Sequence, residues 1–433
     1  MFLRHRFFLV LVAVILITGS GFAFAPLFTL GRWLTLALLV MVVADIVLLW
    51  HRRAISASRQ VSDRFSNGDE NSVTISVESS YPFPVRLEVI DEAPIQFQSR
   101  NLSFLLSPST SHTYSLRPTR RGTYSFGHIR VFASTWLGLV ERRYTCALPQ
   151  DVKVYPSYQQ LHQLELIAIS RNLQEPGIKR IRRIGNNTEF EHIRDYLRGD
   201  DYRTVNWRAT ARLHRPMVNV YQQERSQQVF AIIDKGRVMQ QAFDNMTLLD
   251  YAINASLALG YVAMHKEDRA GLITFTSGVE TIVPADRRPG HIKKLLETLY
   301  AEQTDFGETD FSALCVHVNK HVLRTSLLVV YTNFIGMVAL RRQLPFLRQL
   351  SRRHRVLVVF FEDVELADYA ATPAVNEEDE CRHVMAEKFI YEKQLMVSTL
   401  RQNGIYALLT APDRLTADVV NRYLEMKSQG LLA

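Results

Sequence analysis

The chain has 433 residues, a length that fits two or three domains. Its composition is 47% hydrophobic and 22% charged, which is typical of a globular protein and excludes wholesale disorder and fibrous repeats. The formal net charge of +8 favours a surface that faces anionic lipid or acidic protein. No aromatic-basic module accompanies this charge, so nucleic acid is not an expected partner. Cys146, Cys315 and Cys381 lie far apart, which argues against a disulfide framework or a thiolate zinc site and favours a reducing compartment.

Two apolar runs open the chain. No charge occurs from Phe7 to Gly31, and a second run from Trp33 to Trp50 is interrupted only by Asp45. Each run is long enough to cross a hydrocarbon core of ~30 Å, so we expect a transmembrane helical hairpin over residues 1–58 in contact with the lipid bilayer. A cleaved signal peptide is the less favoured alternative, because its apolar region is shorter and a second span follows at once here.

The basic flanks of the two runs predict their orientation. Arg4 and Arg6 precede the first run and Arg52 and Arg53 follow the second, whereas the connecting turn holds only Arg32. Positive residues stay inside, so both ends of the hairpin and everything after it are expected in the cytoplasm. We expect Asp45 to reach the interface or to pair with these arginines, in preference to acting as a functional intramembrane carboxylate.

Residues 59–155 have the pattern of a small antiparallel β-sandwich. Apolar side chains alternate along two segments, at Val73, Ile75 and Val77 and again at Val85, Leu87 and Val89. Glycine, proline and serine punctuate these and the following short runs, as they do in sandwiches. The segment contains no cluster of ligating residues, so we expect a packing or spacer module.

Residues 226–433 alternate between apolar strands and helices. Short apolar strands are expected at 229–234, 270–275, 327–333 and 356–361, and each is followed by a helical stretch. This alternation predicts a doubly wound, mainly parallel sheet that is buried on both faces. Ligands of such sheets bind at the carboxyl ends of the strands.

Three strand ends and loops carry the candidate site. The order Asp234, Thr309, Asn333 is similar to the von Willebrand factor A domain, in which Asp-x-Ser-x-Ser, a threonine and a further aspartate hold magnesium. Asp234 and Thr309 match that motif. Gly236 and Val238 occupy its serine positions, and Asn333 occupies the position of its last aspartate.

These departures weaken a metal site. Magnesium prefers six hard oxygen ligands, whereas Gly236 and Val238 supply no hydroxyl and Asn333 no charge. Lys235 and Arg237 add positive charges. We therefore expect no cofactor and weak or absent magnesium binding. The structural alternative is that Asp234 caps a loop or helix and Thr309 begins a helix.

The connector at residues 156–225 contains the densest pattern of mixed charge. Phe190, Ile193 and Leu197 would share one helical face, and Gly199 would end that helix. Asp200 or Asp201 would cap a second short helix. The charged positions are Glu189, Glu191, Arg194, Asp195, Arg198, Asp200, Asp201, Arg203, Arg208 and Arg212.

Two interpretations of these charges remain. The favoured one is a set of arginine-carboxylate pairs that locks the connector, through interleaved apolar residues such as Trp207, onto a flanking core. The alternative is a metal-dependent hydrolase that uses Asp195, Asp200 and Asp201, which would need a defined pair in a pocket. The two are distinguished by whether these carboxylates converge in an open cleft or are each covered by an arginine.

The stretch E-F-x-x-I-R-x-Y-x-x-G-D-D-x-R-x-x-N-W-x-A-x-A-R resembles the signature of the bacterial family called "domain of unknown function 58". The preceding Arg-Arg-Gly-x-Tyr and Leu-Gly-Leu motifs are also similar to that family, and the resemblance covers essentially the whole chain. The signature positions are Glu189, Phe190, Arg194, Tyr196, Gly199, Asp200, Asp201, Arg203, Asn206, Trp207 and Arg212.

The resemblance implies a membrane-anchored bacterial protein of the inner membrane with a von Willebrand A-like domain. It also implies association with a MoxR-type AAA+ ATPase and no secure enzymatic activity. We therefore expect a non-enzymatic interaction or scaffold protein that works with such an ATPase in the assembly or maturation of other membrane or envelope proteins.

Overall fold

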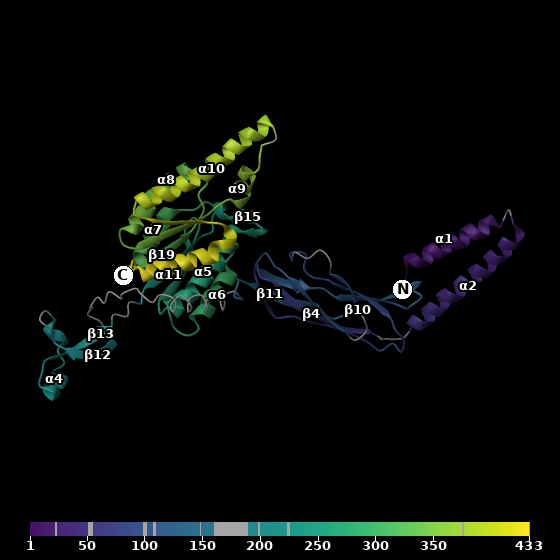
Figure 1. Ribbon diagram of the computed structural model, residues 1–433, viewed down its shortest axis with the longest axis horizontal. Coiled ribbons are helices and arrows are strands. Elements are labelled where there is room, and N and C mark those ends of the chain that lie inside the picture. Colours follow the sequence, from purple (N-terminus) through teal and green to yellow (C-terminus); the bar gives the residue numbers. More distant parts are fainter. Residues whose placement is uncertain are drawn as a thin grey trace. The chain divides into compact units, whose positions relative to one another are not determined.

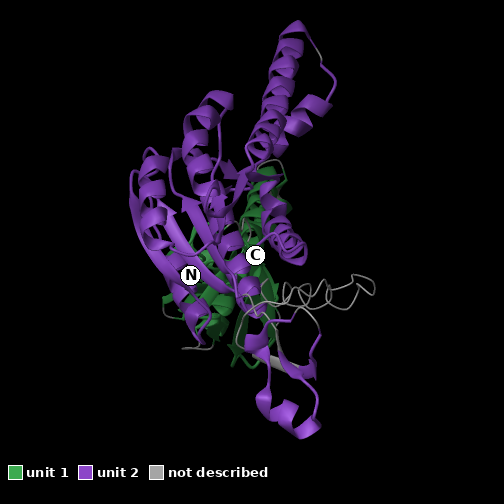
Figure 2. Cartoon of the chain, turned by 90° about the vertical axis from the view of Figure 1, so that its left-hand side faces the viewer, with its two compact units in different colours: residues 1–157 green, residues 158–433 purple. Residues whose placement is uncertain are grey.

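The computed structural model describes residues 1–21, 24–50, 55–97, 102–106, 110–147, 149–159, 189–197, 200–222, 226–374 and 376–432. These residues form two compact units, Met1–Ser157 and Tyr158–Ala433 (Figure 2). Each unit is described by itself below.

The N-terminal unit begins with two packed helices. A short strand, β1 (Phe2–Leu3), precedes α1 (His5–Ser20), and α2 (Ala25–Leu49) follows. A Cβ atom placed on Gly31 of α2 would lie 2.9 Å from Thr18 Cγ2 of α1, so the absence of a side chain at Gly31 lets the helices approach closely.

Only α2 is long enough to span a bilayer by length and composition, among the described residues. Its apolar stretch runs from Pro26 to Leu49. The helix α1 is apolar but has 16 residues, which at 1.5 Å per residue covers roughly 24 Å and falls short of the ~30 Å hydrocarbon core. The N-terminus therefore fits a membrane anchor or a signal sequence, and the first predicted span is shorter than its apolar run.

Among the described residues Asp45 does not pair with an arginine as expected, and Arg52 and Arg53 lie outside them. Its side chain is fully buried where α2 meets the β-sheets of the same unit. Its oxygens accept hydrogen bonds from the backbone N–H groups of Leu139 (3.1 Å) and Val140 (2.9 Å) and from the Thr135 hydroxyl. Asp45 thus anchors α2 to the sheets, because the segment between β9 and the start of β10 supplies three buried hydrogen-bond donors.

Three sheets complete the N-terminal unit. The largest has the order β1-β10 (Val140–Cys146)-β9 (Ile129–Ser134)-β5 (Arg86–Asp91)-β6 (Ser103–Leu106) and is antiparallel. The second, also antiparallel, has the order β2 (Ile55–Gln60)-β4 (Asn71–Ser79)-β7 (Thr110–Leu116). The third has the order β3 (Arg64–Ser66)-β11 (Gln150–Tyr155)-β8 (Gly122–Phe126), with β3 and β11 parallel.

The predicted alternation forms the core of this unit. Ile75 and Val77 of β4 and Leu87 and Val89 of β5 are buried in one apolar cluster, which brings the first two sheets face to face. Successive side chains of a strand point to opposite faces, so period-two patterning predicted the buried face. The same cluster includes Leu49 at the end of α2, so the helix and the sheets share a core.

The second unit contains a six-stranded sheet in the order β18 (Val279–Asp286)-β17 (Arg269–Phe275)-β14 (Gln228–Asp234)-β19 (Leu327–Tyr331)-β20 (Arg355–Phe361)-β21 (Tyr406–Thr410). All neighbours are parallel except β17 and β18, which pair antiparallel at one edge. The short pair β15 (Ala242–Phe243) and β16 (Met246–Thr247) follows β14.

Helices cover both faces of this sheet, as the apolar strands predicted (Figure 1). On one face lie α5 (Leu248–His265), α6 (His291–Ala301) and α11 (Leu415–Ser428). On the other lie α7 (Phe311–His321), α8 (Met337–Ser351) and α10 (Glu377–Gln402). The helix α9 (Val364–Ala371) follows β20. Strands such as β19 and β20 are buried on both faces and read as continuous apolar runs for that reason.

The signature segment is a hairpin, and the predicted helix at 190–197 is wrong. The strand β12 (Glu189–Asp195) pairs antiparallel with β13 (Met217–Gln222). A 3-10 turn, η1 (Tyr202–Thr204), and a short helix, α4 (Trp207–Leu213), lie between the two strands. The β-branched Val218 and Val220 of the partner strand favour pairing, and this long-range contact overrides the helical spacing of three apolar residues. We call residues 189–222 the signature module.

Candidate functional site

The strand ends of the second unit meet at the point where the strand order reverses. From β14 the chain passes to β17 on one side and later returns to β19 on the other side. The carboxyl ends of β14 and β19 therefore flank a topological switch point, the usual ligand position in open α/β sheets. Asp234 ends β14, and Thr332 and Asn333 follow β19.

Asp234 is fully engaged by internal donors. Its Oδ1 accepts hydrogen bonds from Thr309 Oγ1 (2.8 Å) and from the Gly236 backbone N–H (2.8 Å). Its Oδ2 accepts one from Thr332 Oγ1 (2.6 Å). Burial raises the pKa of Asp234, and the three hydrogen bonds act in the opposite direction without cancelling it. The Asp234 side chain is therefore buried and accepts hydrogen bonds from three separate segments of the chain.

The structure brings Asp234 and Thr309 together but not Asn333. The strand β19 ends at Tyr331, earlier than expected, so it is Thr332 that faces Asp234. Asn333 Oδ1 accepts instead from Lys393 Nζ of α10, at 2.6 Å. The helix α7 is capped by Asp310, whose side chain accepts from the Ser312 N–H, and not by Thr309.

The position of the first motif serine has no room for a side chain. A Cβ atom on Gly236 would lie 1.9 Å from Thr309 Oγ1 and 2.9 Å from Asp234 Oδ1. Glycine at this position therefore leaves room for the Thr309-Asp234 hydrogen bond. In a metal site, Asp234 would coordinate the ion instead. Among the described residues, no group of three or more His, Cys, Asp or Glu side chains is arranged to hold a metal ion.

The buried Lys235, next to Asp234, forms an ion cluster with two glutamates that the sequence pattern did not predict. Its Nζ donates to Glu280 Oε2 (2.6 Å), Glu302 Oε2 (2.7 Å) and the Gln303 carbonyl (2.9 Å). Burial alone would lower the pKa of Lys235, but the hydrogen bonds with Glu280 and Glu302 outweigh it and raise the pKa. A lysine directly after a strand-end aspartate was the signal available, whereas its partners are 45 and 67 residues away.

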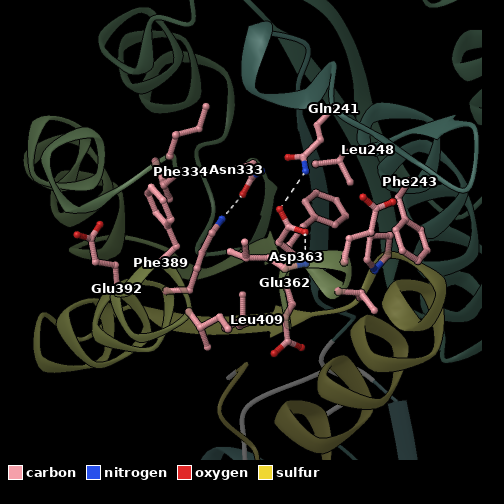
Figure 3. Close-up of a pocket in the computed structure, with 18 of the residues that line it drawn as sticks. Gln241, Phe243, Leu248, Asn333, Phe334, Glu362, Asp363, Phe389, Glu392 and Leu409 are labelled. Atoms are coloured by element: carbon pink, nitrogen blue, oxygen red, sulfur yellow. Dashed lines mark hydrogen bonds between the residues drawn. The ribbon is translucent and has the colours of Figure 1, made fainter. Parts of the chain in front are cut away.

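A pocket of about 320 Å³ lies beside Asn333 at the same edge of the sheet (Figure 3). Its walls are mostly apolar, and its lining also includes four carboxylates: Glu362, Asp363, Glu365 and Glu392. Lys393 also lines it, and burial lowers the pKa of Lys393 to about 8, with Asp363 partly opposing the shift. No carboxylate of the described residues lies within ion-pair distance of Lys393, although Phe360 offers its ring at 5.7 Å.

Each of the three aspartates of the signature module has its own hydrogen-bond donor or ion-pair partner. Asp200 accepts two hydrogen bonds from Arg194 (2.7 and 2.8 Å) and one from the Leu197 N–H. Asp195 pairs with Arg215 at 3.3 Å. Asp201 caps η1 by accepting from the Arg203 N–H, as the sequence predicted for one of the two adjacent aspartates.

The remaining signature positions shape the turn between the strands. Asn206 caps α4 by accepting from the Ala209 N–H, and it also donates to Asn219 Oδ1 of β13. Tyr196 donates from its backbone N–H to the Pro216 carbonyl. For Glu189 and Phe190 the structure describes the backbone in β12, and Gly199 lies outside the described residues.

Several apolar side chains of the signature module are exposed, contrary to the expectation that they pack against a core, whereas Met217 and Val218 of β13 are buried. Trp207 is 74% exposed, Tyr202 71% and Leu197 63%, and no residue of α4 is buried. The guanidinium of Arg203 lies 5.8 Å from the Tyr202 ring centre. Apolar and charged residues are therefore exposed side by side on η1 and α4.

Comparisons with known proteins bear on this segment. Residues 192–380 match the model of the family described as "Protein of unknown function DUF58". "Uncharacterized protein YeaD" of Bacillus subtilis is 26% identical over 317 residues, which are 68% of this chain and 75% of that protein. "Uncharacterized protein Rv1480" of Mycobacterium tuberculosis is 25% identical over 265 residues, 58% of this chain and 82% of that protein.

Solved structures add little. Proximal thread matrix protein 1 from the mussel byssus aligns with 45% of this chain and 47% of its own at 10% identity, with a TM-score of 0.27. That score supports no argument about fold. The family match begins within β12 and ends within α10, so it takes in most of the signature module and much of the α/β sheet. It agrees with the resemblance based on the signature, and the relatives' names assign no activity.

Proposed function

We propose that this chain is a non-enzymatic interaction protein of the bacterial inner membrane. In this proposal α1 and α2 both cross the bilayer as a hairpin, and the α/β unit is a von Willebrand factor A-like domain presented to the cytoplasm. Its partner is a MoxR-type AAA+ ATPase, with which it serves the assembly or maturation of other envelope proteins.

The observation that carries this proposal is the closed strand-end site. A metal-dependent adhesion site needs open coordination positions, and an enzyme needs a free acid-base pair. Both carboxylate oxygens of Asp234 instead accept hydrogen bonds from Thr309, Gly236 and Thr332. The paired carboxylates of the signature module support the same conclusion, because a hydrolase would need them to converge in a cleft. Membrane anchoring is supported by the apolar length of α2 and the basic flanks.

Affinity capture of the tagged full-length protein from detergent-solubilised membranes tests the proposal. Mass spectrometry should find an AAA+ ATPase enriched over a capture with the tag alone, and enrichment should survive in Asp234→Asn. Capture without any ATPase contradicts the partner. A hydrolytic activity that a folded Asp200→Asn variant loses would instead favour the metal-dependent hydrolase.

A further inference from the structure

Two features of the second unit remain without a role: the exposed surface of the signature module and the pocket at the carboxyl edge of the sheet. The first, which we call the signature surface, consists of Tyr202, Arg203, Trp207, Arg208 and Arg212, all exposed. The second, which we call the acidic pocket, is the 320 Å³ cavity beside Asn333.

The signature surface has the composition of a protein-binding hot spot. Tryptophan, tyrosine and arginine dominate such sites because they combine large apolar area with directed hydrogen bonds. Among the described residues no carboxylate lies within ion-pair distance of Arg203, Arg208 or Arg212, since Arg194 and Arg215 take Asp200 and Asp195. Aromatic and cationic groups are thus exposed together on η1 and α4.

The acidic pocket has the complementary chemistry. Phe243, Leu248, Phe334 and Leu409 contribute apolar wall, and Ile335 remains 74% exposed. The exposed Glu362 and Glu365 belong to the lining, together with Asp363 and Glu392, so the lining contains four carboxylates and one ammonium group. A ligand with an aromatic ring and flanking guanidinium groups would meet apolar wall at its centre and carboxylates at its edge.

Lys393 could form a cation-π contact with an aromatic ring that enters the pocket. Its Nζ has the neutral Asn333 Oδ1 as its hydrogen-bond acceptor and the Phe360 ring 5.7 Å away. Figure 3 labels Asn333 within the pocket lining, and Lys393 of α10 belongs to the same lining. An indole ring is the best cation-π acceptor among side chains and would add to the partial stabilisation that Asp363 gives this ammonium group.

We propose that the signature surface of one copy of this chain docks into the acidic pocket of a second copy, with Trp207 as the central side chain. The connection between the two parts favours a second copy. The chain enters β14 at Gln228, five residues (223–227) after β13 ends, and Gln228 is at the amino end of a seven-residue strand whose carboxyl end is Asp234.

The chain enters β14 at its amino end, whereas the acidic pocket lies at the carboxyl ends of the strands. Docking within one chain would therefore require the signature module to fold back along roughly 23 Å, the length of β14. A second copy meets no such restraint. The resulting interface is heterologous, since one surface meets a different one, and it continues head to tail into a ring or filament.

Sedimentation of the full-length protein in detergent tests this proposal. The wild type should associate as its concentration rises, and higher salt should weaken the association because guanidinium-carboxylate contacts carry part of it. Trp207→Ala should weaken association about 30-fold, the loss typical of a hot-spot aromatic side chain. The control is Trp136→Ala, which removes a tryptophan that is 70% exposed in the other unit and should leave association unchanged.

Mixing two variants identifies the interface. Arg208→Glu/Arg212→Glu damages the signature surface and Glu362→Arg/Glu365→Arg damages the acidic pocket, so each variant alone should be monomeric. Mixed, they retain one intact surface and one intact pocket and should form dimers but no longer assemblies. All four positions are exposed, and unchanged melting curves would show that both variants are folded.

The remaining outcomes overturn the proposal. A wild type that stays monomeric at all concentrations, or a mixture that forms no dimers, removes the second copy as the occupant. Crosslinks between positions 207 and 335 within a single chain would assign the signature surface to its own pocket. These outcomes leave the ATPase partnership untouched, because that partnership is tested separately by capture.

Discussion

Asp234 illustrates how one residue decides between a ligand site and a structural element. A strand-end carboxylate at a topological switch point is normally available to a ligand. Here the hydroxyls of Thr309 and Thr332 and the Gly236 N–H use its oxygens, and Gly236 makes this possible by leaving space for Thr309. The raised pKa of Asp234 means that its charge is a cost to the folded state, which the three donors partly offset.

We predict weak or absent magnesium binding at Asp234. Magnesium would have to displace three hydrogen bonds and still find oxygen ligands at the positions of Gly236 and Val238. Calorimetric titration of the full-length protein should show no heat beyond that of an Asp234→Ala control. Micromolar affinity that disappears in the control would show that the loop opens to accept the ion.

At the scale of elements, buried hydrogen bonds join α2 to the sheets of the N-terminal unit. The carboxylate of Asp45 accepts from Thr135, Leu139 and Val140, and the Tyr81 hydroxyl donates to the Leu49 carbonyl at 3.2 Å. A charged acceptor in a dry contact is strong when satisfied and costly when lost. The helix therefore enters the sheet core as part of the fold.

We predict that Asp45→Ala loosens this junction. Three buried donors would lose their acceptor, at about 1–3 kcal/mol for each donor left unsatisfied. Hydrogen exchange at residues 139–140 should accelerate, while the exposed substitution Thr35→Ala on the same helix serves as a matched control. Unchanged protection in Asp45→Ala would show that another acceptor or water replaces the carboxylate.

The signature module depends on its own short contacts, because none of the residues of η1 and α4 is buried. Hydrogen bonds from Arg194 and from the Leu197 N–H hold the pKa of Asp200 below its usual range. A lowered carboxyl pKa contributes stability that is present above the unfolded pKa and is lost as the pH falls through the folded value. The turn should therefore loosen in acid.

We predict that Asp200→Ala and Asp201→Ala both destabilise the module, and that Asp200→Ala does so more. Asp201→Ala removes a cap worth ~1 kcal/mol, whereas Asp200→Ala removes a bidentate partner of Arg194 together with a backbone acceptor.

Hydrogen exchange at Leu197 and Arg203 measures both effects. Asp195→Ala is the control, because its pair with Arg215 is exposed and should contribute little. Equal exchange in Asp200→Ala and in the control would contradict a structural role for Asp200.

At the scale of the whole molecule, the distribution of basic residues predicts a cytoplasmic location for the part of the chain after residue 58. Protease added to intact cells should leave residues after 58 undigested, because Arg4, Arg6, Arg52 and Arg53 bracket the apolar runs on one side. Cell lysis should make the same residues accessible. Digestion in intact cells with cytoplasmic markers preserved would reverse the orientation.

The regular elements of both units were predictable where one local period decided the structure. Alternation at Val73, Ile75 and Val77 predicted a buried strand face, and continuous apolar runs predicted a parallel sheet covered on both faces. The helix at 190–197 was wrong, since three apolar residues at helical spacing cannot reveal a partner strand at 217–222. The exposure of Leu197 and Trp207 was also unpredictable, because a pattern in which charged and apolar residues alternate suits either a core or a surface.

The sequence by itself determined the apolar N-terminus, the pattern of strands and helices in each unit, and the absence of serine at positions 236 and 238. These features depend only on residue type and short-range spacing. Only the tertiary structure decided what each polar group contacts. Asp45 found donors some 90 residues away, Asp234 found Thr309 and Thr332, and Lys393 found Asn333. Buried polar groups must be paired, but any of several partners can satisfy them, so the choice belongs to the packing of distant segments.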